Sequence, residues 1–294
     1  MSFSGDVKEE LVKLDSSARH CQIAELAAIM VYGNAVKYSD DNEAYIEIQS
    51  DTLYLENKSA ELISKILGVN KTEAFMLNKD KIKVQKLLET IKYTKGDLLV
   101  NPILVKSMCC KRVFLRGVFL SIGSMSNPEK GYHLEFVCEA NVQAEQLLDT
   151  LAVFGIEAKV VQRKKYQVVY IKESEGIVEL LNVIGAHVSL MKLENLRILK
   201  DMRNSINRRV NCEAANITKT VNAATKQIED IQYIKEHYGF DNLSDNLREI
   251  AQLRLDYPDA TLKELGQYLV PTVGKSGVNH RLRKLCELAE EIRT

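Results

Sequence analysis

The chain has 294 residues, with 40 Lys and Arg balanced by 40 Asp and Glu, so its formal net charge is zero. This length leaves room for two domains, and a hydrophobic content of 46% is enough for a real core. The absence of Trp and an aromatic content of 6% argue against an aromatic-rich sugar or peptide binder. With 4 Pro and 14 Gly, the chain is neither collagen-like nor of low complexity.

The N-terminal segment and the hydropathy pattern bear on where the protein works. The segment MSFSGDVKEEL contains acids and no apolar run, so no signal peptide is predicted. No run of about 18 apolar residues occurs, so no membrane-spanning helix is expected. These features predict a cytoplasmic protein.

Cysteine and histidine spacing does not predict a metal site. None of the six cysteines forms a CxxC pair, and Cys109 and Cys110 are adjacent, whereas zinc ligands normally have two or more residues between them. We therefore expect buried, reduced thiols. No phosphate-binding loop or dinucleotide fingerprint occurs, so neither a metal nor a cofactor is predicted. Four scattered histidines are expected to be structural or on the surface: His20, His133, His187 and His237.

The first 70 residues predict helices followed by strands. A helix is predicted from Asp6 to Leu14, and a second, apolar helix in CQIAELAAIMVYGN ends near Gly33 and Asn34. The segments AYIEIQ and DTLYLE alternate apolar and polar residues, which predicts two strands. The segment KSAELISKILGV then predicts a helix that ends at Gly68.

The same order of elements recurs about 90 residues later. An apolar helix in KRVFLRGVFLSIGSMSNP ends at Gly123, GYHLEFVCEA alternates as a strand, and QAEQLLDTLAVFG predicts a helix that ends at Gly155. The segment AKVVQRKKYQVVYIK predicts a strand hairpin, and EGIVELLNVIGA predicts another helix. Two halves with this shared order indicate an internal duplication.

A polar, helical segment follows, from about Met202 to His237. Between Lys200 and Lys226 it holds six Lys or Arg and two Asp or Glu, a local charge of +4. Two interpretations remain open: a solvated connecting helix, or a helix that lies along phosphates and gains affinity by releasing counterions. For Arg208 and Arg209 the alternatives are a phosphate clamp and a salt bridge to the N-terminal domain. Lys219 is a further candidate phosphate contact.

The remaining residues, from Leu243 to Thr294, predict three helices. The first, in DNLREIAQLRLDYPDA, is ended by Pro258, and Thr261 begins the second with a capping box to Glu264. The third begins at Lys275 or Ser276 and continues to about Ile292. Three short helices in this order match a helix-turn-helix, although the connection VPTVGKSG is longer than the usual turn of three or four residues.

The third helix lies in a segment without acids, from Leu265 to Cys286. Its apolar residues Val278, Leu282, Leu285 and Ala289 fall on one stripe, and polar and cationic residues fall on another face. Asn pairs with adenine and Arg with guanine in the major groove, and carboxylates would be repelled by phosphate. An ordinary solvated helix face is the alternative. The predicted DNA contacts are Lys275, Ser276, Asn279, His280, Arg281, Arg283 and Lys284.

The segments LAAIMVYGN and LRGVFLSIGS share apolar residues interspersed with small ones, followed by Gly. Such helices can pack closely, and with the repeated strands they resemble the LAGLIDADG homing-endonuclease fold. In active members of that family, an acid before the final Gly of each motif holds the divalent metals. Here those positions are Tyr32 and Ile122, so the resemblance implies a fold whose catalytic acids are lost. Glu25 lies about two helical turns upstream and is not expected to replace them.

The whole chain resembles the bacterial WhiA regulators, in which a LAGLIDADG-like domain precedes a helix-turn-helix. The resemblance is carried by SFSGDVKEEL, CCKRVFLRGVFLSIGS, NRRVNCEAANITKTVNAA and LKELGQYL followed by KSGVNHRLRKL. It implies an α+β protein with an inactive pseudo-two-fold αββαββ domain (residues 1–199), a basic helical linker (200–238) and an all-α helix-turn-helix domain (239–294). It also implies transcriptional control linked to cell division and chromosome segregation.

Three hypotheses of function follow. The first is a non-enzymatic, nucleoid-associated regulator that binds double-stranded DNA, with Lys111 and Arg112 as further phosphate contacts and Lys106 and Arg116 as weaker candidates. Arg116 has the alternative of being a buried, paired cation. The second is a regulator whose N-terminal domain senses a ligand or docks a protein, such as an RNA polymerase sigma factor, which overall neutrality favours. The third is a metal-dependent endonuclease. Because both motifs occur in one chain, a monomer is expected.

Overall fold

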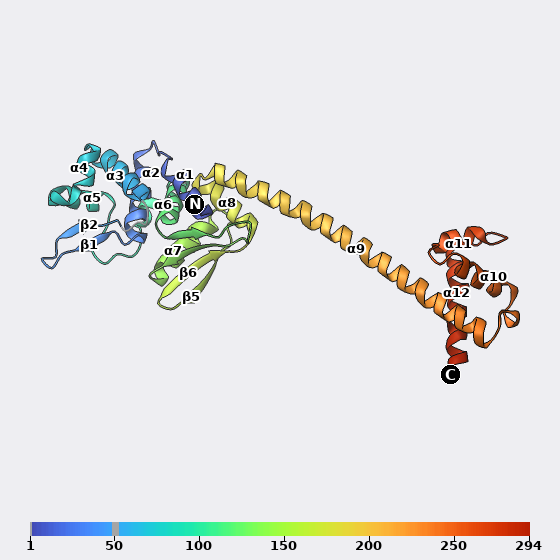
Figure 1. Ribbon diagram of the computed structural model, residues 1–294. Helices are drawn as coiled ribbons and strands as arrows, with labels where there is room; N and C mark the ends of the chain where they lie inside the picture. The colour runs from blue at the N-terminus through green and yellow to red at the C-terminus, as the bar shows by residue number, and fades with distance from the viewer. Residues whose placement is uncertain (1, 49–52) are drawn as a thin grey trace. The chain divides into compact units, whose positions relative to one another are not determined.

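The computed structural model describes residues 2–48 and 53–294 and divides into two compact units (Figure 1). Unit 1 comprises Met1–Lys200 and unit 2 comprises Asp201–Thr294. Unit 1 is mixed α and β, whereas the described elements of unit 2 are all helical. Each unit has its own hydrophobic core cluster.

Two buried helices, α2 (Arg19–Tyr32) and α6 (Met108–Ile122), form the centre of unit 1. The residues of α2 from Ala24 to Tyr32 are all buried, as expected for a helix that is covered on every side. The predicted close packing of small residues is confirmed. A Cβ atom added to Gly117 would lie 2.6 Å from the backbone oxygen of Glu25 and 2.8 Å from the Cβ of Ala28.

The second half of unit 1 follows the predicted order of elements, with one addition: the strand β3 (Gly123–Met125), which directly follows the helix α6, was not predicted. Alternation in β4 buries Leu134, Phe136 and Cys138 on one face, and antiparallel pairing places Phe136 opposite Val169. The four strands form an antiparallel sheet in the order β3-β4-β6-β5. The elements are β3 (Gly123–Met125), β4 (Leu134–Cys138), α7 (Asn141–Ala152), β5 (Lys159–Arg163), β6 (Tyr166–Ile171) and α8 (Ser174–Ile184).

The first half of unit 1 departs from this order. The strand predicted in DTLYLE is wrong for its described residues, because Leu53 begins the helix α3 (Leu53–Leu67). The apolar residues Leu55, Leu62 and Ile66 of α3 are all buried, a spacing of seven and four residues that suits one helical face. Two residues of that predicted strand, 51 and 52, and residue 49 of the preceding one lie outside the described residues.

Only two short strands are found among the described residues of this half. β1 (Val36–Tyr38) was not predicted, and it pairs antiparallel with β2 (Ala44–Ile46), which covers the first three residues of the strand predicted in AYIEIQ; the next two, Glu47 and Ile48, are described and are not strand. After α3 the first half continues with helices, whereas the second half continues after α7 with the hairpin of β5 and β6. The shared order of elements therefore extends only as far as α3. The other elements of this half are α1 (Phe3–Val12), α4 (Lys71–Phe75), η1 (Leu77–Lys79), α5 (Lys81–Thr90) and η2 (Pro102–Val105).

One helix of 51 residues, α9 (His187–His237), belongs to both units. It begins at His187 and therefore within the segment predicted to be the first domain. Near its start, Leu193 is fully buried in the core of unit 1, and Ser189 donates hydrogen bonds to Glu10. Near its end, Ile231 and Ile234 are fully buried in the core of unit 2.

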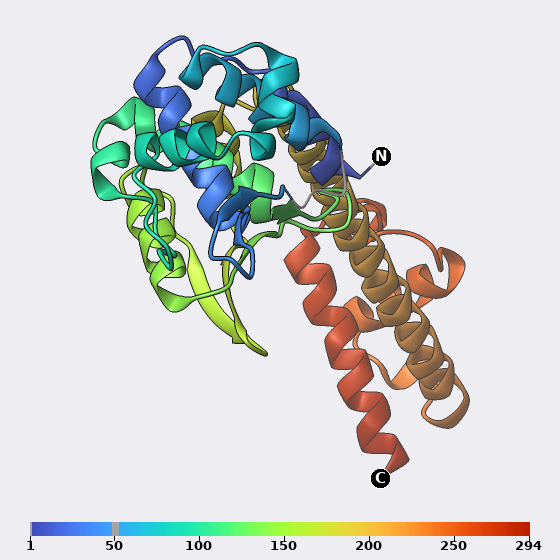
Figure 2. The ribbon, with the colours of Figure 1, turned by 90° about the vertical axis from the view of Figure 1, so that its left-hand side faces the viewer.

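Unit 2 consists of the last part of α9 followed by η3 (Phe240–Asn242), α10 (Asp245–Asp256), α11 (Leu262–Tyr268) and α12 (Lys275–Arg293). The three predicted helices and the capping box between Thr261 and Glu264 are confirmed. Within this unit α12 lies beside the C-terminal part of α9 (Figure 2). Asp230, which is buried on α9, pairs with Arg293 at 2.8 Å, and Lys226 pairs with Glu290 at 3.0 Å.

The prediction of buried thiols is wrong for Cys109 and Cys212, which are exposed. Cys109 lies in the first turn of α6, and Cys212 lies in a long exposed stretch of α9. Cys21, Cys110 and Cys138 are buried. Within residues 2–48 and 53–294, no helix has both the length and the apolar character that crossing a bilayer would require.

Gly117→Ala is expected to destabilise the protein by about 1–3 kcal/mol, because the added methyl group meets the backbone of α2, which cannot yield without separating the helices. The measurement is urea unfolding followed by circular dichroism. Gly131→Ala is the control, since a Cβ there meets nothing within 4 Å, and its stability should change by less than about 1 kcal/mol. Equal effects of the two substitutions would contradict the close approach of the helices.

Candidate nucleic-acid interface

The last helix of unit 2, α12, has one buried side and one exposed polar side. The predicted apolar stripe is confirmed, because Val278, Leu282, Leu285 and Ala289 are all fully buried in the core of unit 2. The predicted DNA contacts lie away from it. Arg281 is partly buried. The other predicted contacts are exposed, namely Lys275, Ser276, Asn279, His280, Arg283 and Lys284.

Arg283 differs from its neighbours because it has an acidic partner. Its Nε donates to Glu287 at 2.9 Å, one helical turn later and just beyond the segment without acids. Both side chains are exposed, and such surface pairs contribute about 0–1 kcal/mol. The pair can therefore open at little cost when a phosphate or a base competes for the guanidinium.

The connection between α11 and α12 runs from Leu269 to Gly274, so it is longer than a usual turn, as predicted. It folds back tightly on α11, where the amide of Val273 donates to the carbonyl of Gly266 at 3.0 Å. A Cβ on Gly266 would lie 2.1 Å from the carbonyl oxygen of Val273. This close approach requires glycine at position 266 and sets the entry of α12.

Arg254 is a positioning residue that the sequence analysis missed. It is 2% exposed, and its guanidinium donates to the carbonyl oxygens of Pro258 at 3.2 Å and Ala260 at 2.7 Å. Burial lowers the pKa of this guanidinium from its ordinary value. These bonds hold the turn between α10 and α11, and thus the start of α11. The one feature of the sequence that could have indicated this role is the position of Arg254 shortly before a turn that contains Pro258.

A hollow of about 600 Å³ in unit 2 brings together residues predicted to have separate roles. Lys219, expected to contact phosphate, lines it together with Lys275 and Asn279 of α12. Lys263 and Arg254 add two further cations, and Asp259 is the one acid among the lining residues. The charged side chains that line this hollow beside the first turn of α12 are therefore mostly cationic.

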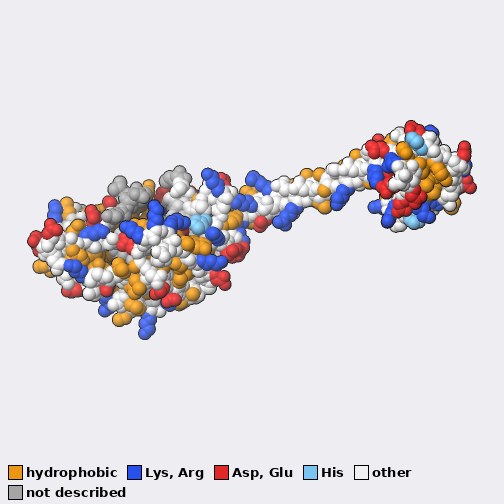
Figure 3. Space-filling view, turned by 90° about the horizontal axis from the view of Figure 1, so that it is seen from below, with side chains coloured by type: hydrophobic (Ala, Val, Ile, Leu, Met, Phe, Trp, Pro, Cys, Tyr) orange, Lys and Arg blue, Asp and Glu red, His pale blue; other side chains and the backbone are white. Residues whose placement is uncertain are grey.

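The exposed middle of α9 supplies a second group of cations. Every residue from Asp201 to Ala223 is exposed, including Arg208, Arg209 and Lys219. Lys and Arg side chains recur along this helix on the face shown in Figure 3. Arg209 lies 3.7 Å from Glu213 on the same helix, an exposed pair that does not fix the arginine.

The candidate cations of unit 1 differ in their surroundings. Lys111 is partly buried, whereas Arg112 is exposed and lies over the ring of Phe154 at 5.5 Å. Arg116 is a largely buried, paired cation, since its side chain is 12% exposed, its Nε donates to Ile184 at 2.8 Å, and it lies 3.6 Å from Glu25. Arg116 therefore belongs to the packing of unit 1 and not to a DNA-contacting surface.

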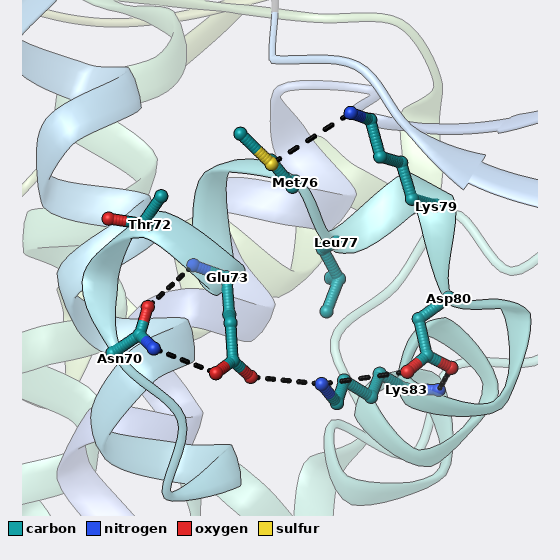
Figure 4. A pocket seen from close by; sticks show the side chains of 8 residues that line it. All are labelled: Asn70, Thr72, Glu73, Met76, Leu77, Lys79, Asp80 and Lys83. Atoms are coloured by element: carbon teal, nitrogen blue, oxygen red, sulfur yellow. Dashed lines mark hydrogen bonds and ion pairs between the residues drawn. The ribbon is translucent and has the colours of Figure 1, made fainter.

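A cavity of about 370 Å³ near α4 and α5 has polar walls that satisfy one another (Figure 4). Asn70 accepts a hydrogen bond from the amide of Glu73 and donates to its carboxylate. Lys83 then pairs with Glu73 at 2.9 Å and with Asp80 at 3.5 Å. The charges are balanced within the cavity, so its geometry does not favour a charged ligand.

Two family models match the chain. The model of the WhiA LAGLIDADG-like domain matches residues 111–203, and the model of the WhiA C-terminal HTH domain matches residues 206–289. Proteins named "Probable cell division protein WhiA" from Lachnoclostridium phytofermentans and Lachnospira eligens are 48% and 44% identical to this chain. The alignments cover all of this chain and 100% and 98% of those proteins.

The chain belongs to the WhiA family. Its fold is also similar to the crystal structure of full-length DUF199/WhiA from Thermatoga maritima, with a TM-score of 0.54, 24% sequence identity and coverage of 99% of both chains. The α+β fold with a LAGLIDADG-like domain and a C-terminal helix-turn-helix is therefore confirmed.

In this WhiA family member, the two positions predicted to correspond to the endonuclease acids hold packing residues. Tyr32 is 3% exposed, and its hydroxyl lies 3.1 Å from the carbonyl oxygen of Gln143 and 3.1 Å from the side-chain oxygen of Gln146. Its ring packs edge-on against Phe114. Ile122, at the end of α6, is partly buried. Neither side chain offers an oxygen with the charge that a divalent cation prefers.

Glu25 is fully buried between the two helices of this WhiA core. Burial raises the pKa of its carboxyl above the ordinary 4.5, and the neighbouring Arg116 opposes that shift. The hydroxyl of Ser16 donates to one carboxyl oxygen at 3.3 Å. The other oxygen has no hydrogen-bond partner among the described residues. Glu25 is thus part of the packing, in agreement with its exclusion as a replacement catalytic acid.

Glu25→Gln is expected to change how stability depends on pH. The folded protein holds the Glu25 proton more tightly than the unfolded chain, so this group favours folding at low pH, and that contribution is lost as pH rises from about 4.5 through the raised pKa. The free energy of unfolding of the variant, relative to the parent, should therefore increase between pH 4 and pH 7. Urea titrations across this range measure it, and a difference independent of pH would contradict the assignment.

Proposed function

We propose that this protein is a sequence-specific DNA-binding regulator of transcription that acts in cell division and chromosome segregation, on the bacterial nucleoid. The observation that carries the proposal is the exposed face of α12, which has cationic and amide side chains and no acid until Glu287. A carboxylate on that face would be repelled by DNA phosphates, whereas its Asn and Arg side chains match base edges of the major groove. The match to a helix-turn-helix model supports the same interface.

The proposed contacts have two roles. Asn279 and His280, with Ser276 and Arg283, contact base edges from the exposed side of α12. Lys275, Arg281 and Lys284 contact phosphates, as does Lys219, which lines the same hollow as Lys275. Arg208 and Arg209 on α9, and Lys111 and Arg112 in unit 1, add phosphate contacts that carry no sequence information.

The cell-division role rests on the family. The two relatives that are 48% and 44% identical to this chain are named as probable cell division proteins, and the alignments cover 100% and 98% of their length. Their names do not mention transcription or chromosome segregation, which come from the resemblance to WhiA regulators. We further propose a monomer, since both LAGLIDADG-like motif helices, α2 and α6, pack together within one chain.

We propose that the protein is not an enzyme. Tyr32 and Ile122 occupy the positions of the catalytic acids, and the nearby Glu25 is bound to Arg116. A metal-dependent endonuclease is the alternative, and it would need carboxylates elsewhere to converge. Nicking of supercoiled DNA with Mg²⁺ or Mn²⁺ separates the two, and metal-dependent cleavage that survives full purification would favour the nuclease.

A row of exposed apolar side chains on α9 favours a second function, the docking of a regulatory protein such as a sigma factor. The residues Met202, Ile206, Val210, Ile217 and Val221 are spaced by four or seven residues and are each more than half exposed. This spacing places them along one side of the helix, as in helices that bind a partner through an apolar seam. DNA binding and partner docking are compatible in one regulator.

The DNA-binding proposal is tested with full-length variants and a DNA site selected by the parent protein from random sequences. Asn279→Ala is expected to weaken binding to the selected site roughly 5- to 150-fold, because a bidentate base contact is lost, and to affect random DNA little. Arg208→Gln is expected to weaken both DNAs alike and to reduce the slope of log affinity against log salt by about one. Fluorescence anisotropy over a range of salt concentrations measures both effects.

Lys71→Gln provides the matched control, because Lys71 is an exposed lysine on α4 of unit 1. It should leave the affinity and the salt slope unchanged. If Asn279→Ala binds the selected site as tightly as the parent does, the assignment of α12 as the helix that contacts the bases is overturned. A selection that yields no preferred sequence would overturn sequence specificity itself.

A further inference from the structure

Four potential metal ligands meet at the N-terminal ends of α2 and α6, although they are far apart in the sequence. His20 and Cys21 lie in the first turn of α2, and Cys109 and Cys110 lie in the first turn of α6. One ligand atom from each of the four residues can be chosen so that all lie within 4.8 Å of one another. The sequence carries no spaced motif that would reveal this group, because each helix supplies two adjacent ligands.

The distances are close to those that a small cation needs. The Nδ1 of His20 is 3.1 Å from the sulfur of Cys110 and 3.5 Å from the sulfur of Cys21. A tetrahedral zinc ion, with bonds of about 2.3 Å to sulfur and 2.0 Å to nitrogen, requires ligand atoms about 3.5–3.8 Å apart. Small side-chain rotations are therefore enough to close four ligands around one ion.

We propose that His20, Cys21, Cys109 and Cys110 form a Cys₃His zinc site that joins the N-terminal ends of α2 and α6. Three thiolates and one imidazole are a ligand set that structural zinc uses, and soft sulfur ligands select zinc over Mg²⁺ or Ca²⁺. On binding, each thiol loses its proton to solvent and its sulfur donates an electron pair to the metal, without any redox change.

The burial of the four residues suits a site that loads from solvent. Cys21 and Cys110 are buried at 6% and 4% exposure, whereas His20 and Cys109 are exposed. Cys21 and Cys110 form a small apolar cluster with Ala24 and Val113, which shields the inner side. Ser107, the N-cap residue of α6, lies 3.3 Å from the sulfur of Cys109 and can orient that ligand.

This site would add to the role of the helix pair in unit 1. The two helices approach closely at Gly117, in the middle of α6, and near their N-terminal ends Cys21 and Ala24 of α2 pack with Cys110 and Val113 of α6. A zinc ion at these ends would fix the separation and angle of the pair. Because Tyr32 and Ile122 are at the opposite ends of α2 and α6, the proposed site is distinct from the positions of the lost endonuclease acids.

The test uses the full-length chain, purified under reducing conditions without chelator. We expect about one zinc per chain by inductively coupled plasma mass spectrometry. With cobalt in place of zinc, a thiolate-to-cobalt charge-transfer band and intense tetrahedral d–d bands should appear. Cys109→Ser and His20→Gln alter exposed ligands, so these variants should fold, as circular dichroism will check, yet lose most of the bound zinc and the cobalt spectrum. Removal of zinc should lower the melting temperature of the parent.

Cys212→Ser is the matched control, because Cys212 is an exposed cysteine on α9 outside the cluster. It should retain one zinc and the full cobalt spectrum. Three results would overturn the proposal: a reduced parent chain that binds no zinc after reconstitution, a folded Cys109→Ser or His20→Gln variant that binds zinc as tightly as the parent, or loss of zinc only in the control. A disulfide between the two helices, with no zinc bound after its reduction, counts as the first of these.

Discussion

The close approach of α2 and α6 is the constraint on which unit 1 depends. Gly117 brings the backbones together at Glu25 and Ala28, where no larger residue fits without displacement. Separating these buried helices would lose their close-packed van der Waals contacts, so their relative position is fixed. The strands and helices that follow each of them pack around this fixed pair. The ion pair of Glu25 with Arg116 and the hydroxyl contacts of Tyr32 give partners to polar groups enclosed by that packing, although one oxygen of Glu25 has no hydrogen-bond partner among the described residues.

The positions of the catalytic acids in the endonuclease fold illustrate how packing can replace chemistry. Tyr32 fills its site with a ring against Phe114 and hydroxyl contacts to α7. An unpaired carboxylate at the same depth would carry a large desolvation cost unless a metal compensated it. The uncharged side chain of Tyr32 avoids this desolvation cost.

In unit 2, packing leaves one side of a helix exposed. That exposed side of α12 does not contribute to the hydrophobic core. The apolar stripe of α12 anchors the helix, and Arg254 and Gly266 hold the turns on either side of α11. The side chains from Lys275 to Lys284 that point away from the core are free to meet a ligand. Two of them, Lys275 and Asn279, line a hollow together with Lys219 from α9, and its shape depends on the helix ends around it.

The sequence by itself determined most of the helices, three strands of the four-stranded sheet in unit 1, the capping box at Thr261 and the buried stripe of α12, because these follow from local periodicity and capping. It failed at Leu53, where a short alternating segment is the first turn of a helix, and it could not reveal Arg254 or the shared hollow. Only the tertiary structure decided that Cys110, 90 residues after His20, lies beside it. Such groups form where two helices pack, and contacts between distant segments leave no periodic or spaced signal in the chain.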